Sequence, residues 1–269
     1  MRTLPTSGEI PTHRVMIDRR TNREVGPRVP VDPDAWPFAN LHPSEILWRY
    51  MNLKKFTHLM TTASLYFARQ DRFKDPFEGR FSEGNSTSFS QSDVALHSAY
   101  NLSRTLEEAK SQYETHRRCV FISCWHRNTA ESQEMWNAYT PEAESVVVTT
   151  SAKALYRFIP DQIMKSPVKY HSTDFARAEF GWNTLSFYKP ESYGFEREFR
   201  MLRNLEEGDS VQFDNPADFG RCVPAQLKKI IHRVITHPKA DEQTKQKVDA
   251  LLTTHLKKVR RENSSLDMR

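Results

Sequence analysis

The chain has 269 residues, of which 27% are charged and 38% apolar, a composition typical of a folded protein rather than a disordered one. No apolar run approaches the roughly 20 residues that cross a bilayer, and the first residues lack the apolar stretch of a secretion signal. These features argue against membrane-spanning and secreted classes and predict a cytoplasmic protein with three reduced cysteines. The net charge of +5 permits binding to nucleic acid or to phosphate-rich small molecules without requiring it.

The composition changes along the chain and predicts three regions. Residues 1–40 are rich in Pro and Arg and show no hydrophobic periodicity, so they are expected to form an arm without a helix. A single α+β domain of catalytic type is expected over residues 41–254. Residues 255–269 carry clustered Lys and Arg and are expected to form a basic, polar tail.

Within the domain, helices and strands are predicted in an irregular order. Helices are expected where helix formers continue without Pro or Gly, over residues 93–118, 131–139, 151–159 and 239–262. Strands are expected where β-branched and aromatic residues cluster, over residues 65–68, 119–125, 144–151, 166–172, 195–202 and 211–214. Residues 224–238 are predicted to pass from a short helix into a strand. The lack of a regular strand–helix–strand repeat favours an α+β fold over a doubly wound one.

Several motifs occur in an order that resembles one known family. The segments are "LWRYMN", "SLYFARQDRFKDPFEGRF", "CVFISCWHRNTAESQEMWNAYT" and "FYKPESYGFEREFRML". They resemble the family named domain of unknown function 2971, and the resemblance covers the chain from Ile46 to Leu251. Its most specific parts are residues 73–79 and 123–125, followed by Trp136. The chain departs from the family before "SVVVTTS", where many members have a glycine, so the local turn stays open. The family label carries no activity.

A second and weaker resemblance is to ADP-ribosyltransferases. These enzymes hold NAD in a split antiparallel core, with an Arg or His on an early strand, aromatic residues along the cleft and a glutamate at the start of a later strand. Arg49, Tyr66 and the pair Glu196 and Glu198 occur in this order here. The resemblance implies an ADP-ribosyltransferase-like split antiparallel sheet with flanking helices and NAD as the ligand.

The segment "SYGFEREFRML" contains the two candidate catalytic residues, Glu196 and Glu198. On a strand, residues two apart project from one face. Two like charges side by side are unfavourable unless a cation lies between them, and the ribosyl cation that forms as nicotinamide leaves is such a charge. Glu198 is then expected to bind a ribose hydroxyl and stabilise the cation, and Glu196 to orient or deprotonate the attacking group. The alternative is that both glutamates pair with Lys189, Arg200 or Arg203 on an exposed face.

Arg49 is the candidate for binding phosphate. It lies in the otherwise apolar stretch "ILWRYM", between Trp48 and Tyr50. A guanidinium presents a fork of donors that suits a pyrophosphate. The alternative is an Arg that extends from a strand towards solvent or pairs with Asp75 or Glu78.

Aromatic residues near Arg49 in the motif order are the other candidates for contacts with NAD. Tyr66 or Phe67 is expected to stack on a nicotinamide or adenine ring, with Tyr66 favoured for its polar tip, although an aromatic residue on a short strand is more often part of the core. Trp136 is expected either to line the cleft or to be part of the core. Tyr50 and Phe73 are assigned to the same NAD site.

Two other functions remain open from the sequence. A metal-dependent nuclease or phosphodiesterase would gather Asp75, Glu78, Glu196 and Glu198 around Mg²⁺, although "EREFR" has Arg where the common nuclease pattern has Lys. A non-catalytic module that binds a nucleotide or a protein is the third hypothesis. No two Cys/His pairs have zinc-type spacing, so no metal site is predicted. A chain with eight glycines and no Gly-rich phosphate loop also argues against P-loop and Rossmann folds.

The main prediction is therefore an NAD-dependent, ADP-ribosyltransferase-like enzyme that modifies a macromolecule. The basic charge of the chain makes RNA or DNA one candidate for this acceptor. A role as a toxin or in phage defence is suggested only by the kinds of families that keep such domains. An antitoxin or regulatory protein would then be the partner, and the sequence does not identify it.

Overall fold

The structure is a computed structural model, and its chain divides into two units, residues 1–40 and residues 41–269. It describes residues 13–18, 23–30, 41–75, 78, 106–171, 183–205, 209 and 211–266. In the first unit, β1 (His13–Asp18) pairs antiparallel with β2 (Arg23–Pro30), with a register shift between Arg14 and Met16. Part of the region expected to be an irregular arm is therefore a two-stranded ribbon.

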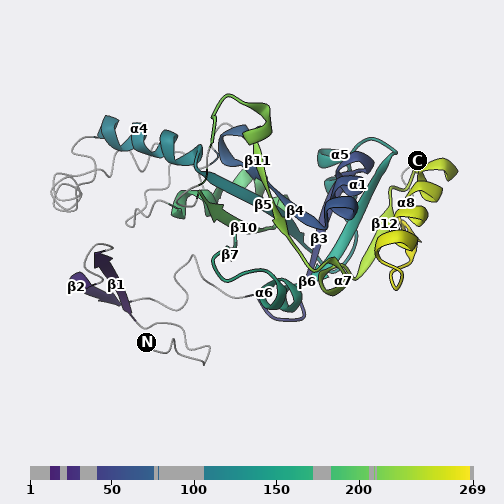
Figure 1. The fold of residues 1–269 in the computed structure, drawn as a ribbon, viewed down its shortest axis with the longest axis horizontal. Coiled ribbons are helices and arrows are strands. Elements are labelled where there is room, and N and C mark those ends of the chain that lie inside the picture. Colours follow the sequence, from purple (N-terminus) through teal and green to yellow (C-terminus); the bar gives the residue numbers. More distant parts are fainter. Residues whose placement is uncertain are drawn as a thin grey trace. The chain divides into compact units, whose positions relative to one another are not determined.

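The second unit is built on a large, mostly antiparallel sheet with helices, so it is an α+β fold (Figure 1). The sheet order is β11–β4–β5–β3–β6–β12–β13, and β10 and β7 extend it from β5. The strands are β3 (Ile46–Asn52), β4 (Ser64–Arg69), β5 (Val120–Arg127), β6 (Ser145–Ser151), β7 (Met164–Pro167), β10 (Glu198–Asn204), β11 (Gly220–Pro224), β12 (Arg233–Thr236) and β13 (Arg261–Asn263). In this sheet, only the β12–β13 pair is parallel among the described strands.

The central strand β5 is where the sheet divides. One edge of β5 pairs with the whole of β10, from Glu198 opposite His126 to Asn204 opposite Val120. Its other edge pairs with β4 at residues 121–122 and with β3 at residues 126–127. Between these contacts, residues 123–125 have no ladder partner on that edge among the described strands. The strands β3 and β4 therefore separate from each other across β5, and α1 (Leu53–Thr62) connects them.

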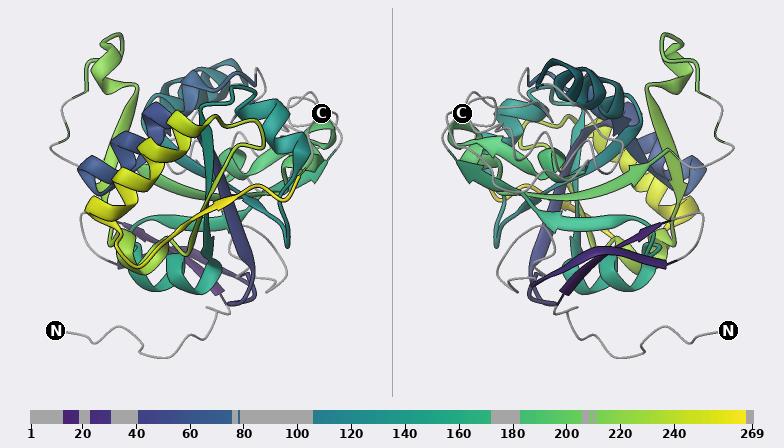
Figure 2. Two further views of the ribbon diagram at one scale, coloured as in Figure 1. Left: turned by 90° about the vertical axis from the view of Figure 1, so that its right-hand side faces the viewer. Right: turned by 90° about the vertical axis from the view of Figure 1, so that its left-hand side faces the viewer.

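The two faces of the sheet have separate apolar clusters. On β3, Leu47 and Met51 enter the larger core, whereas Trp48 enters a smaller cluster with Trp136 and parts of β6 and β12. Because successive residues of a strand point to opposite faces, the two clusters lie on opposite sides of the sheet. The larger core includes residues of α1, α6 (Ala152–Phe158), α7 (Leu227–Ile230) and α8 (Glu242–His255), and α1 and α8 lie side by side (Figure 2). Helix α5 (Gln133–Tyr139) supplies Trp136 to the smaller cluster.

Short elements complete the described unit. A separate two-stranded parallel sheet joins β8 (Lys169–His171) to β9 (Tyr188–Pro190). The remaining helices are α4 (Leu106–Arg117), η1 (Gln70–Arg72), η2 (Thr184–Phe187), η3 (Glu191–Glu196) and η4 (Pro216–Asp218). No described helix combines the length and the apolar character needed to cross a membrane.

Some predicted elements differ from the structure or lie partly outside its described residues. Of the helix expected over 93–118, residues 106–117 form α4, and residues 93–105 lie outside the described part of the chain. The closing helix ends at His255, and residues 261–263 form β13 where a polar tail was expected, because Leu256 is buried in the larger core and draws the chain back to the sheet. Residues 211–214 are not a strand.

Candidate active site

The two candidate glutamates lie on either side of a backbone kink. The prediction that both belong to one strand is wrong, because Glu196 ends η3 and Glu198 begins β10. Between them Arg197 has a φ of 42°, in the left-handed region that non-glycine residues rarely adopt. The kink, rather than strand alternation, brings the two carboxylates to the same place.

Neighbouring strands hold this kink through hydrogen bonds to consecutive peptide groups. His126 Nδ1 lies 2.6 Å from the carbonyl oxygen of Glu196, and since a carbonyl only accepts, Nδ1 is the donor. The other bonds are Arg127 N–H to Arg197 O at 3.0 Å, Glu198 N–H to Tyr170 Oη at 2.7 Å, and Val168 N–H to Glu198 O at 2.9 Å. Backbone strain at one residue persists only where its surroundings over-determine it, and these bonds supply that constraint.

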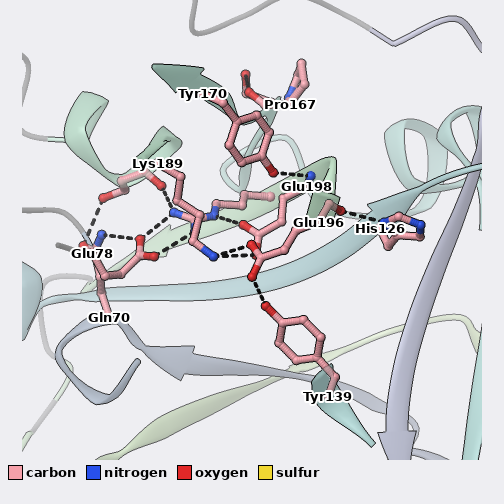
Figure 3. Close-up of polar contacts among 12 residues, drawn as sticks. Gln70, Glu78, His126, Tyr139, Pro167, Tyr170, Lys189, Glu196 and Glu198 are labelled. Carbon is pink, nitrogen blue, oxygen red and sulfur yellow. Dashed lines mark hydrogen bonds and ion pairs between the residues drawn. The ribbon is translucent and has the colours of Figure 1, made fainter. Parts of the chain in front are cut away.

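Both carboxylates converge on Lys189. Its Nζ contacts Glu196 Oε2 directly and lies 3.4 Å from Glu198 Oε1 (Figure 3). The three residues are buried, with 2%, 5% and 4% of Glu196, Glu198 and Lys189 exposed. Lys189 is on β9, opposite Tyr170 of β8, so the small parallel sheet delivers both side chains to the kink. The glutamates are ion-paired as the alternative expected, but in the interior rather than on an exposed face.

Arg200 links Glu198 to a third buried carboxylate. Phe199 and Met201 enter the larger core, so alternation along β10 directs Glu198 and Arg200 to the other face of the sheet. Arg200 Nε bonds Glu198 Oε2, and its two terminal nitrogens bond Glu78 at 2.5 and 2.8 Å. This fork is the bidentate geometry that a carboxylate accepts best.

Next to Glu78, the network ends in hydrogen bonds to neutral side chains. Gln70 Nε2 donates to Glu78 at 3.3 Å, and Gln70 Oε1 accepts from the Ser186 hydroxyl at 3.0 Å. Arg200 also donates to the Ser186 carbonyl. The network therefore contains three carboxylates, Glu78, Glu196 and Glu198, but two cations.

The environment separates the pKa values of the two glutamates. Burial and the nearby Glu198 carboxylate raise the pKa of Glu196 to about 7, against the opposing effect of Lys189. Burial would also raise the pKa of Glu198, but Arg200 and Lys189 outweigh it and lower that pKa to about 2. At neutral pH, Glu198 is therefore an anion, and Glu196 is present in both its protonated and its ionised form.

Tyr139 stands between Glu196 and solvent. Its hydroxyl donates to Glu196 Oε1, while 47% of the residue is exposed. It approaches the glutamates from the side opposite Tyr170 (Figure 3). Ser132 caps α5 by accepting from Met135 N–H, and the buried Trp136 ring anchors the helix, so Tyr139 is presented from a fixed element. Burial and the two carboxylates raise the pKa of Tyr139, which keeps its hydroxyl protonated.

Arg49 spans the gap between the separated strands. It donates from Nη2 to the Tyr66 carbonyl at 2.7 Å, and its guanidinium lies 5.7 Å from the centre of the Trp125 ring. It has no carboxylate partner among the described residues, so the alternative of a pairing with Asp75 or Glu78 does not occur there. Burial lowers the pKa of Arg49 to about 10, which still leaves it charged at neutral pH. An unneutralised guanidinium is suited to an anion.

The predicted aromatic residues divide into exposed and buried groups. Tyr66 is 41% exposed, and its ring lies where a Cβ on Gly220 would be, 2.1 Å from ring atoms. Phe67 and Trp136 are fully buried in the two apolar clusters, so the nucleotide contacts predicted for them are not available in this structure. Phe73 is half-buried next to η1.

Tyr50 is also held by contacts within the protein. Its hydroxyl accepts from Ser132 N–H at 3.0 Å, and its ring packs against Trp136 with a centroid separation of 4.9 Å. This places Tyr50 beneath α5 rather than free to contact a nucleotide.

Sequence reasoning did not assign several residues that surround the glutamates. The sequence suggests Lys189 and Arg200 only as surface partners of the glutamates, and Glu78 only as a metal ligand or a partner of Arg49. The spacing of Arg200 two residues after Glu198 was a usable signal, because both then share a strand face. No signal in the sequence indicated Tyr170 or His126, which reach the kink from strands distant in the chain.

A metal site finds no support in the described part of the chain. Its His, Cys, Asp and Glu side chains form no group of three or more arranged to hold a metal ion. Of the four carboxylates proposed for a nuclease, three are instead engaged by cations: Glu78 by Arg200, and Glu196 and Glu198 by Lys189. Comparison with known proteins found no matching protein-family model and no matching curated protein.

Proposed function

We propose that this protein is an NAD-dependent, ADP-ribosyltransferase-like enzyme that transfers ADP-ribose to a macromolecular acceptor. The observation that carries the proposal is the pair of adjacent buried carboxylates whose pKa values are shifted in opposite directions, Glu196 upwards and Glu198 downwards. Titratable neighbours with separated pKa values are typical of paired acid–base sites. The proposal also relies on the resemblance of the sequence motifs to the domain of unknown function 2971 family and to ADP-ribosyltransferases.

The two glutamates have different roles in this proposal. Glu198, ionised at neutral pH, would stabilise the positive charge that develops on the ribose as the bond to nicotinamide breaks and its electron pair leaves with nicotinamide. Glu196, with a pKa near 7, would take the proton of the attacking group as its bond to the ribose forms. Tyr139 would have to release Glu196 for this step, since its hydroxyl now occupies one oxygen of that carboxylate.

Two features of the divided sheet support a dinucleotide ligand. Arg49 carries a positive charge without a carboxylate partner among the described residues, which suits the pyrophosphate. The exposed Tyr66 ring, on the strand whose carbonyl Arg49 binds, suits a planar base. Phe73 remains a candidate for the same site. The proposed acceptor is RNA or DNA, for which the net charge of +5 is the support, and a toxin or phage-defence role is the biological setting we propose.

The test is NAD consumption by wild type and by Glu198→Gln, measured as released nicotinamide with and without added RNA or DNA. We expect Glu198→Gln to lower kcat/KM for NAD by at least about a hundred-fold, because a preorganised charge at the developing cation is removed. Glu262→Gln is the matched control, since Glu262 is an exposed carboxylate on β13 that pairs with Arg233. Activity on NAD that survives Glu198→Gln would contradict the proposal.

One observation favours a second candidate, a non-catalytic nucleotide-binding module. Glu78 and Glu198 are both saturated by cations, as expected of a structural network. Such a module would bind NAD in calorimetry without releasing nicotinamide, and its affinity would fall with Arg49→Met but not with Glu198→Gln. Loss of a nucleic-acid-cleaving activity on chelation would instead point to the metal-dependent nuclease.

A further inference from the structure

His126 contacts the backbone between the two glutamates rather than either carboxylate. It lies on β5, directly opposite Glu198 of β10, and only 3% of it is exposed. Its Nδ1 donates to the Glu196 carbonyl at 2.6 Å, which requires the hydrogen to be on Nδ1. The other ring nitrogen, Nε2, is buried and has no hydrogen-bond partner in the described part of the chain. The imidazole is thus in the Nδ1–H tautomer, and its ring makes one hydrogen bond among the described residues.

That bond lies at the start of the strained turn. The Glu196 carbonyl belongs to the peptide that enters Arg197, the residue with positive φ. The next carbonyl, that of Arg197, accepts from the backbone of Arg127, the residue after His126. Two consecutive residues of β5 therefore hold two consecutive carbonyls of the kink. If the first were released, Arg197 could relax to an ordinary φ, and the two carboxylates would no longer have to meet at Lys189.

We propose that His126 is a positioning residue, which through its Nδ1–H tautomer holds the Glu196 peptide so that the Glu196 carboxyl stays on Lys189 and Tyr139. The effect of His126 on the rate of nicotinamide release rests on the proposed function, whereas its effect on the position of Glu196 does not. Burial lowers the pKa of His126, in keeping with a neutral ring. The charged neighbours that act on the ring are Arg197, Glu134 and Glu198.

The carboxyl that His126 positions is surrounded by three titratable groups. Lys189 approaches from β9, Tyr139 from α5 and Glu198 from β10. The raised pKa of Glu196 depends on its burial and on its proximity to Glu198. A turn that relaxes would move Glu196 away from both influences, and its pKa would return towards the ordinary range of a glutamate.

Two amide substitutions of His126 both supply a hydrogen-bond donor but place it at different positions. In His126→Asn, the side-chain NH₂ stands close to the place of Nδ1, so the bond to the Glu196 carbonyl is kept. In His126→Gln, the NH₂ stands close to the place of Nε2, so a similar polar side chain loses that bond. Rescue by Asn but not by Gln is a pattern that loss of packing alone would not produce.

The experiment has two independent readouts. The first is ¹⁵N NMR of the wild-type histidines, with the His126 signals assigned by their absence from His126→Asn; we expect Nδ1 to be protonated and Nε2 to be bare at neutral pH. The second is the pH dependence of nicotinamide release. We expect His126→Asn to keep kcat within about three-fold of wild type, and His126→Gln to lower it at least about ten-fold, the effect of one hydrogen bond. In wild type, nicotinamide release is expected to rise with pH as Glu196 ionises near pH 7, and in His126→Gln this rise should shift to a lower pH.

The outcomes distinguish this inference from the proposed function. An Nε2-protonated tautomer would overturn the positioning role whatever the enzyme does. Equal kcat values and equal pH profiles for the Asn and Gln variants would overturn it as well. If the wild type releases no nicotinamide, the proposed function fails, and the positioning role is then tested by ¹³C NMR titration of Glu196, whose pKa should be close to wild type in His126→Asn and lower in His126→Gln.

Discussion

A network of ion pairs at the kink and a single ion pair at the edge of the sheet have the same chemistry and opposite surroundings. Around the kink, Glu78, Arg200, Glu198, Lys189 and Glu196 form a continuous network that is almost entirely buried. At the edge of the sheet, the pair Arg233–Glu262 joins β12 to β13 with both side chains more than 40% exposed. Water screens the exposed pair and leaves it a small contribution, whereas each buried charge depends on its partners. The comparison indicates that residues of the buried network constrain one another, while the surface pair is separable from the fold.

The largest expected effect is that of removing the cation shared by two carboxylates. Arg200→Met would leave Glu78 and Glu198 buried without their strongest partner. We expect the free energy of unfolding, measured by urea denaturation at neutral pH, to fall by about 3 to 5 kcal/mol. A fall of less than about 1 kcal/mol would place the buried network in the same class as the surface pair.

The next effect is a dependence of stability on pH. The pKa of Glu196 is raised from 4.5 to about 7 in the folded protein. The folded state therefore binds the proton more tightly, and the stability contributed by Glu196 is fully present below about pH 4.5 and is lost as pH rises through about 7. Urea denaturation at about pH 5 and about pH 8 should show a loss of roughly 3 kcal/mol from this group.

The matched variants isolate that contribution from other titrating groups. Glu196→Gln should remove it, so that unfolding free energy changes less between the two pH values than in wild type. Glu262→Gln, on the exposed pair, should keep the wild-type slope, since the pKa of Glu262 is lowered by Arg233 and so titrates at acid pH. An unchanged slope in Glu196→Gln would show that Glu196 does not hold the proton.

A smaller effect is expected at the kink itself. Glycine adopts a positive φ without the steric cost that Arg197 bears, so Arg197→Gly should raise the free energy of unfolding by about 0.5 to 1 kcal/mol. Ala63, which ends α1 with a φ of 48°, is the matched position, and Ala63→Gly should give a gain of the same size. A gain at Ala63 together with a loss at Arg197 would mean that the arginine side chain contributes more than its backbone strain costs.

The smallest effect is expected at the surface pair. Arg233→Met should change the free energy of unfolding by no more than about 1 kcal/mol, and added salt should reduce the difference further. A loss as large as that of Arg200→Met would remove the contrast between the two regions.

Much of the architecture follows from local patterns. The clusters of β-branched residues around 146–150 and 120–125 form β6 and β5, and irregular alternation predicted the α+β class. The strand expected over 195–202 starts three residues before β10 and ends two residues before its end, and the early start arises because nothing in the local pattern marks Arg197 as a residue with positive φ. The last strand, β13, is short and polar and forms only because β12 offers an edge and Leu256 is buried.

The sequence by itself identified the class of the fold, the glutamate pair as its most unusual feature, and Arg49 as a cation in an apolar stretch. The tertiary structure decided whether those charges have partners and how far each is from water. Lys189, Tyr139 and His126 reach the pair from three separate elements, and Glu78 is joined to it through Arg200; their distances from the pair along the sequence do not predict these contacts. A pKa is set by burial and by charges in space, so two glutamates separated by a single residue in the chain acquire opposite shifts only after the sheet has assembled around them.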